Sequence, residues 1–152
     1  MNTTFERYGS LFARLALAAI FVHAGWGKLA NLDGVAGYIG SKGLPAPLLL
    51  ALAAGLVELV GGLALAAGLR TRWAALALAL FLVPTTFFFH NPLGLEAAAA
   101  QMQQIQLFKN LAIIGGLVAV ASLGAGALSL DLLFDRPRRT PARALEQGGA
   151  LS

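Results

Sequence analysis

Four long apolar stretches divide this chain, and they limit its possible folds more than any other feature. They run at about 11–30, 47–69, 72–90 and 104–124. A helix needs roughly 20 residues to cross about 30 Å of hydrocarbon, and a spanning segment must be helical because lipid cannot satisfy the backbone of an open strand. The sequence therefore predicts an all-α integral membrane protein, with a four-helix transmembrane bundle as one domain over residues 1–131.

The composition agrees with this class, because 58% of the 152 residues are hydrophobic and only 12% are charged, unlike a soluble domain. The chain has no cysteine, so a redox role would need a bound cofactor or a partner in place of a thiol pair. The net charge of +4 does not predict a nucleic acid partner, since the basic residues lie beside apolar spans. A cleaved signal peptide is not expected, because polar residues interrupt the first span and three spans follow.

Glycine and proline mark the connections between the spans. Residues 31–47 are expected to form a structured loop, and residues 68–72 a tight turn. Pro84 lies inside the third span and should kink it, while the hydroxyls of the two following threonines can help to satisfy the freed backbone. The basic sequence over 132–152 predicts a flexible tail.

Lys and Arg are distributed unequally between the two sides of the predicted bundle. One side holds Arg7, Arg14, Arg70, Arg72, Arg136, Arg138, Arg139 and Arg143. The other side holds only Lys28, Lys42 and Lys109. By the positive-inside rule, both termini and the tail are predicted to be cytoplasmic, and loops 31–46 and 91–103 to lie outside.

Charged side chains within the spans define a candidate site, because each is costly in lipid unless it meets a protein interior, a partner charge or water. Glu58 lies near mid-membrane and needs such a partner. Helical spacing places five residues on one inward face of the first span: Arg14, Ala18, Phe21, Gly25 and Lys28. The second span has a similar face, whose small residues allow a neighbouring backbone to approach: Ala54, Glu58, Gly61, Gly62 and Leu65.

Matching faces on the third and fourth spans complete the predicted site. They comprise Leu76, Leu80, Val83, Thr86 or Phe87, and His90, and then Gln106, Lys109, Asn110, Ile113 and Gly116. We expect a polar pocket open toward the outer leaflet, with a carboxylate at its bottom and the lysines and histidine at its rim. The candidate catalytic residues are Glu58, His90 and Lys109, the candidate ligand-binding residues are Lys28, Trp26, Asn110 and Thr86, and the candidate structural residues are Arg14, Gly25, Gly61, Gly62 and Arg72.

Structural alternatives compete with each of these roles. Lys28 fits a snorkelling anchor, Arg14 a clamp or anchor at the inner end, and Glu58 a structural ion pair that binds no ligand. His23 lies on the opposite face of the first span, among small residues typical of helix packing or an oligomer contact. Because His23 and His90 lie at different depths and no cysteine is present, neither haem nor a metal site is predicted.

Several short motifs follow one another along the chain. They are Arg14, Gly25-x-x-Lys28, Glu58-x-x-Gly61-Gly62, Gly68, Thr71-Arg72, His90, Lys109-Asn110, Gly124-x-Gly126 and Ser129-x-Asp131. In this order and spacing the pattern resembles the DoxX family of small bacterial membrane proteins, over residues 11 to about 131. The resemblance implies a four-helix fold in the bacterial inner membrane, with both termini inside.

The resemblance also implies an association with redox chemistry. The family is similar to the small subunit of a thiosulfate:quinone oxidoreductase and to members of a membrane oxidoreductase complex, although no residue here selects thiosulfate. One hypothesis is a redox subunit that binds quinone or a partner oxidoreductase, with Glu58 relaying protons. The alternative is a non-enzymatic scaffold or assembly subunit whose buried charges are structural. Solute transport is a weaker third hypothesis, since four helices without internal repeats enclose little space unless the protein forms a homo-oligomer.

Overall fold

Four helices of this protein are long and apolar enough to cross a membrane. The computed structural model describes residues 4–134, where helices are the only regular secondary structure. Their bounds are Thr4–Ala30 (α1), Leu32–Ser41 (α2), Pro47–Ala67 (α3), Thr71–Phe89 (α4), Ala97–Leu123 (α5) and Asp131–Phe134 (α6). The predicted all-α fold with four spanning helices is confirmed. The predicted tail lies outside the described residues from 135 onward.

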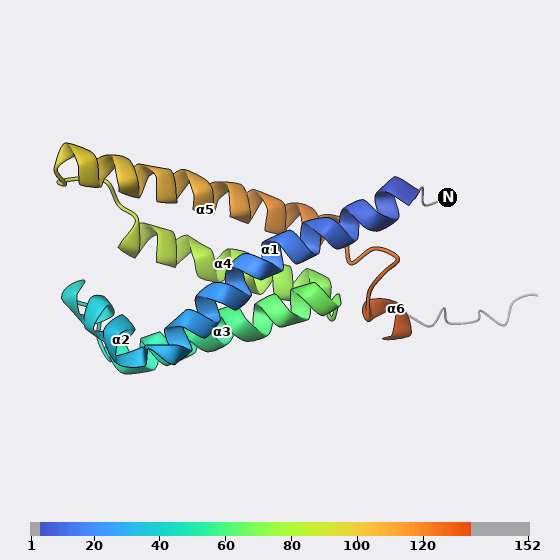
Figure 1. The fold of residues 1–152 in the computed structure, drawn as a ribbon, viewed down its shortest axis with the longest axis horizontal. Helices are drawn as coiled ribbons and strands as arrows, with labels where there is room; N and C mark the ends of the chain where they lie inside the picture. Colours follow the sequence, from blue (N-terminus) through green and yellow to red (C-terminus); the bar gives the residue numbers. More distant parts are fainter. Residues whose placement is uncertain (1–3, 135–152) are drawn as a thin grey trace, which may run out of the picture.

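The spanning helices run back and forth as the sequence predicts (Figure 1). The start of α1, the α3–α4 turn, the end of α5 and α6 all lie at one end, which we call the terminal end. The helix α2 and the α4–α5 connection lie at the other end, which we call the α2 end. The terminal end therefore corresponds to the predicted arginine-rich side of the bundle, and the α2 end to the side with the lysines. Which membrane face each end occupies stays a prediction.

The helices α1 and α3 form the most extensive contact in the bundle, and glycine makes their close crossing possible. A Cβ on Gly25 would lie 2.5 Å from the Leu59 amide nitrogen and 2.8 Å from the Gly55 oxygen. Further along the same crossing, a Cβ on Gly62 would lie 3.0 Å from the Val22 amide nitrogen. A side chain at either glycine would push the backbones apart, so these residues set the distance and register of α1 on α3.

The buried faces agree with the prediction for two of the spans. In α1 the buried residues are Arg14, Ala18, Phe21 and Gly25, and in α3 they are Ala51, Gly55, Glu58, Gly62 and Leu65. The predicted face of the third span is wrong: Leu76, Leu80 and Val83 are exposed, whereas α4 buries Thr71, Ala75, Leu78, Ala79 and Leu82. Because α4 is apolar on every side, hydrophobic spacing does not distinguish its lipid face from its protein face.

The segment predicted as a loop over residues 31–47 contains the helix α2, so that prediction is also corrected. The side chain of Asn31 caps α2 by accepting a hydrogen bond from the Gly34 amide at 3.3 Å. Ile39 is buried, and α2 packs on α3. The cap and this packing outweigh the low helix propensity of the glycines in the segment.

Pro84 lies inside α4, and the helix continues beyond it to Phe89. The hydroxyl of Thr85 donates to the Phe81 carbonyl at 2.9 Å, and that of Thr86 donates to the Leu82 carbonyl at 2.7 Å. Proline at position 84 leaves the carbonyl four residues earlier, at position 80, without its amide donor. The two hydroxyls therefore bond to the carbonyls at positions 81 and 82, and not to the carbonyl at position 80 that Pro84 leaves without a donor.

Arg14 ties three segments together at the terminal end. Its side chain is fully buried, and Nη1 donates to the carbonyls of Leu65 at 3.1 Å and Ala66 at 3.2 Å. Nη2 donates to the carbonyl of Leu128, after α5. Gly68 gives the guanidinium room, since its φ is +68° and a Cβ there would overlap the Arg14 side chain. Arg14 is thus a structural clamp that satisfies carbonyls at the C-terminal end of α3.

Asp131 fixes the α3–α4 turn from the opposite side. Its carboxylate accepts hydrogen bonds from the Arg70 amide at 2.5 Å and the Thr71 amide at 3.0 Å, at the helix end where amides lack intrahelical partners. Partial burial raises the pKa of the Asp131 carboxyl, but these hydrogen bonds and the charge of Arg70 outweigh that effect, so its pKa lies below its usual range.

We predict that Gly25→Ala destabilises the protein by about 1–3 kcal/mol, because the new methyl group overlaps the backbone of α3. Gly27→Ala is the matched control, since a Cβ at Gly27 meets no atom within 4 Å. Thermal unfolding in detergent measures both variants. Equal melting temperatures for the two variants would contradict the role given to the crossing.

We also predict that Asp131→Asn lowers the melting temperature at pH 7, because asparagine accepts the two amide bonds less well. Since folding lowers the carboxyl pKa, the Asp131 contribution is complete above the unfolded value of about 3.9 and is lost as the pH falls through the folded value. The difference between wild type and variant should therefore shrink between about pH 5 and pH 2. Asp33→Asn, at an exposed carboxylate, is the control, and a difference that does not change with pH would refute this account.

Candidate functional site

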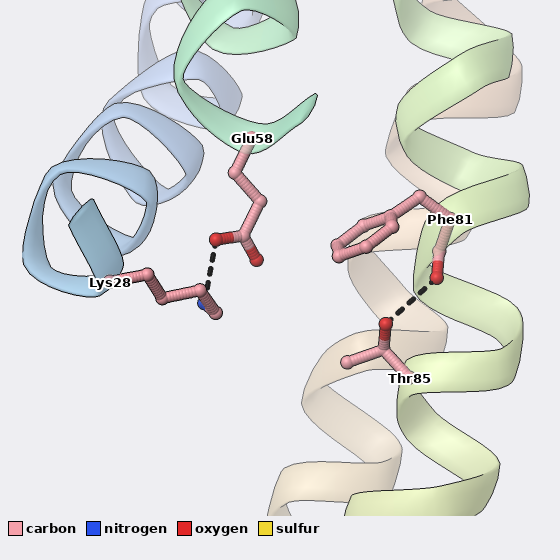
Figure 2. Close-up of polar contacts among 4 residues, drawn as sticks. All are labelled: Lys28, Glu58, Phe81 and Thr85. Atoms are coloured by element: carbon pink, nitrogen blue, oxygen red, sulfur yellow. Dashed lines mark hydrogen bonds and ion pairs between the residues drawn. The ribbon is translucent and has the colours of Figure 1, made fainter. Parts of the chain in front are cut away.

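Lys28 and Glu58 form an ion pair inside the bundle (Figure 2). Nζ of Lys28 lies 2.6 Å from Oε2 of Glu58. Glu58 is only 4% exposed, and the Lys28 side chain keeps 27% of its surface exposed. The α1–α3 crossing produces this geometry, since Gly25 in the turn before Lys28 lies against α3. The predicted buried partner of Glu58 is confirmed, and it is Lys28.

A cavity of about 430 Å³ lies beside this pair, between α2, α3 and α4. Its volume falls in the range of about 300–1,000 Å³ that is typical of small-molecule sites. The wall is formed largely by apolar and aromatic side chains, among them Tyr38, Ile39, Phe81, Phe88 and Phe89. Lys28, Tyr38 and His90 are the titratable residues of the wall, and Figure 2 shows the Phe81 ring directed from α4 toward the ion pair.

Aromatic contacts join α2 to α4 at the edge of the cavity. The rings of Tyr38 and Phe89 have their centroids 5.5 Å apart, and Nζ of Lys42 lies 5.6 Å from the Tyr38 centroid, within range of a cation–π interaction. Tyr38 was not among the predicted site residues, because residues 31–47 were expected to form a loop. The run of phenylalanines at the end of the third span was the available signal for the α4 wall.

His90 ends α4 and contacts both the cavity and α5. Its Nδ1 lies 2.9 Å from Oε1 of Gln103, and an amide oxygen can only accept. In the neutral tautomer that donates from Nδ1 to this oxygen, Nε2 is left as an acceptor. The predicted position of His90 beside the site is confirmed, whereas its partner Gln103 was not foreseen.

Asn110 and Thr86 lie on the other side of α4, where they connect it to α5. Asn110 is buried, and its Nδ2 donates to Oγ1 of Thr86 at 2.9 Å. Neither residue lines the cavity. Both were candidates for binding a ligand, and the structure gives them a role in helix packing.

Neither Lys109 nor Trp26 lines the cavity, so the expected place of Lys109 at its rim is corrected, and Trp26, a candidate ligand-binding residue, lies outside it. Lys109 is exposed and its Nζ donates to Oε1 of Gln106 on the same helix, while Trp26 is 66% exposed. Their neighbours Asn110 and Gly25 are buried. One residue along a helix turns the side chain by about 100°, enough to move it from the core to the surface.

The remaining structural candidates lie at helix contacts. Gly25 and Gly62 form the α1–α3 crossing, and Gly61 faces the side chain of Leu78, which a Cβ would approach to 2.8 Å. Arg72 is exposed and lies beside Gly124, where a Cβ would be 3.5 Å from its Nε. Within residues 4–134, no three His, Cys, Asp or Glu side chains meet as potential metal ligands.

The family model named DoxX matches residues 9–91, which include Lys28, Glu58 and His90. The chain belongs to the DoxX family. Inner membrane protein YqjF of Escherichia coli is 36% identical over 134 residues, which cover 86% of this chain and 95% of YqjF. Inner membrane protein YphA of the same organism is 31% identical over 121 residues, covering 80% and 86%. This DoxX protein is a multi-pass inner membrane protein.

A more distant relative carries a functional description. Putative oxidoreductase CatD of Bacillus subtilis is 36% identical over 83 residues, which cover 55% of this chain and 60% of CatD. No solved structure matches the chain significantly.

We predict that Lys28→Met destabilises this DoxX protein by about 3–5 kcal/mol, because it leaves the buried Glu58 without its partner charge. The double variant Lys28→Met with Glu58→Met should recover most of this loss, since it leaves no isolated charge. Thermal unfolding of wild type, both single variants and the double variant gives the coupling energy. Additive losses would contradict an interacting pair.

Proposed function

We propose that this DoxX protein is a redox-associated membrane subunit that binds a quinone in the cavity between α2, α3 and α4 and works with a partner oxidoreductase. One observation carries the proposal: an apolar, aromatic cavity of about 430 Å³ has the partly exposed Lys28 of a buried ion pair in its wall. The description of the relative CatD as a putative oxidoreductase supports the redox association.

The wall of the cavity suits a flat ring with two carbonyl oxygens. Phe81, Phe88 and Tyr38 supply aromatic surfaces on which such a ring can pack. The ammonium of Lys28 has three hydrogens and gives one hydrogen bond to Glu58, so it can also donate to a quinone oxygen. In the His90 tautomer that donates to Gln103, Nε2 is an acceptor and fits the hydroxyl group of the reduced form.

The ion pair also provides a route for protons. Reduction of a quinone takes up two electrons and two protons, and in this proposal the partner oxidoreductase supplies the electrons. Lys28 can pass a proton to a ring oxygen, and Glu58, 2.6 Å from Lys28, holds the ammonium in place and relays protons to it. A buried carboxylate and amine in contact form the kind of pair that general acid–base chemistry uses.

A non-enzymatic scaffold or assembly subunit is the second candidate function. It is favoured by the fact that Lys28 and Glu58 satisfy each other, as do Thr86 and Asn110. In a scaffold the cavity would hold a lipid chain, and loss of Lys28 would change stability alone.

We predict that a short-chain ubiquinone analogue raises the melting temperature of the purified protein, as any ligand specific to the folded state does. Phe88→Leu should weaken binding by about tenfold, since it removes part of an aromatic contact worth roughly 0.5–1.5 kcal/mol together with buried surface. Phe87→Leu is the matched control, because Phe87 directly precedes Phe88, is 69% exposed and does not line the cavity. Equilibrium dialysis in detergent gives the affinities.

Lys28→Gln should weaken quinone binding further, whereas Lys109→Gln, with the same loss of charge on an exposed side chain, should leave it unchanged. A wild-type protein that the analogue does not stabilise would overturn the proposal. Equal losses in Phe88→Leu and Phe87→Leu would show that the analogue binds elsewhere.

A further inference from the structure

A second groove, of about 460 Å³, lies at the terminal end, and the proposed function does not use it. It is bounded by the first turn of α4, the glycine-rich segment after α5, and α6. We call it the arginine groove, after the Arg70 and Arg72 side chains that line it together with Trp73 and Asp131. Unlike the largely apolar aromatic cavity, the groove is lined by polar and apolar surface in about equal amounts.

Within residues 4–134, the charges of the arginine groove leave the Arg72 guanidinium without an ion-pair partner. Both carboxylate oxygens of Asp131 accept backbone amides of the α3–α4 turn, and the Arg70 side chain acts on the same carboxylate through its charge. Arg72 makes no hydrogen bond or ion pair with any residue in the described range 4–134. Because Asp131 already occupies the amides at the start of α4, an anion in the groove would have to be held by arginine side chains.

The backbone after α5 runs beside Arg72. Gly124 and Gly126 have φ values of +88° and +74°, which favour glycine. A Cβ on Gly124 would lie 3.5 Å from both Nε and Nη2 of Arg72, at ordinary van der Waals distance, so a side chain at this position would cover that edge of the guanidinium. That edge presents two parallel N–H groups, the arrangement that binds two oxygens of a phosphate.

The position of the groove in the molecule indicates where such a phosphate would come from. Trp73 is 70% exposed at the first turn of a spanning helix, and exposed tryptophan at this depth is typical of the membrane interface. Basic pockets between spanning helices bind anionic lipid headgroups. The sequence after α6 adds Arg136, Arg138 and Arg139, so the chain carries further positive charge close in sequence to the groove.

We propose that the arginine groove binds the phosphate headgroup of an anionic phospholipid, with Arg72 as its principal ligand and Trp73 at the level of the headgroup. Arg70 adds positive charge and offsets that of Asp131. The acyl chains of the lipid lie along the exposed apolar surface of α4. This site is independent of the quinone proposal, because it lies at the opposite end of the bundle.

The test uses the full chain in detergent with Trp26→Phe, so that Trp73 is the single remaining tryptophan. Short-chain phosphatidylglycerol, short-chain phosphatidylcholine and inorganic phosphate are titrated separately, and the fluorescence of Trp73 is followed. We expect saturable binding of phosphatidylglycerol, and neither zwitterionic lipid nor inorganic phosphate should bind in the same range. Arg72→Gln should weaken phosphatidylglycerol binding by roughly tenfold, as expected for the loss of charge-assisted hydrogen bonds.

Two variants with the same change of charge serve as controls. Arg7→Gln removes an exposed arginine at the same end but outside the groove, and Arg139→Gln removes one in the C-terminal sequence. The proposal is overturned if either control weakens binding as much as Arg72→Gln, or if phosphatidylcholine binds as tightly as phosphatidylglycerol. Binding of inorganic phosphate at the same concentration would show a soluble anion site and would overturn the assignment to lipid. Thermal unfolding of Arg72→Gln without lipid establishes that the variant is folded.

Discussion

The glycine-mediated crossing of α1 on α3 is the contact on which the rest of the structure depends. A carboxylate near the middle of a spanning helix is costly unless it meets a partner charge, a protein interior or water, and here the partner charge, Lys28, comes from another helix. Gly25 lets the two backbones approach so closely that the ammonium and carboxylate lie 2.6 Å apart. A wider crossing would separate the two charges and leave Glu58 isolated in an apolar interior, which costs more than the pair contributes.

The two ends of the bundle are built differently. At the terminal end, Arg14 and Asp131 bond to backbone groups of three segments and hold the α3–α4 turn to the segment after α5. At the α2 end, side-chain contacts predominate, such as the ring contact of Tyr38 with Phe89 and the bond of His90 to Gln103. Hydrogen bonds from side chains to the backbone hold the terminal end together. The cavity lies at the α2 end, where contacts between side chains predominate.

Polar residues made the inward faces of α1 and α3 predictable, because a charge or a small residue in an apolar helix marks the side that meets protein. The apolar helix α4 lacks such marks on most of its length, and its buried face was assigned wrongly. Polarity alone does not separate Lys109 from Asn110, because both are polar and adjacent in sequence. Packing determines that Asn110 faces inward and Lys109 outward. The Leu128 carbonyl that accepts a hydrogen bond from Arg14 reaches it only through the return of the chain after α5, which local sequence does not encode.

The contact between Tyr38 and Phe89 has a consequence for how the cavity is reached. The helix α2 packs on α3 and α1, and α4 packs most extensively on α5 and also packs on α3, so α2 and α4 meet mainly through side chains, among them this ring pair. Rotation of an aromatic ring is far faster than separation of packed helices. If the cavity binds a quinone as proposed, the quinone would enter sideways from the hydrocarbon phase, and its supply would be governed by its mole fraction in the leaflet and by lateral diffusion, independently of its solubility in water.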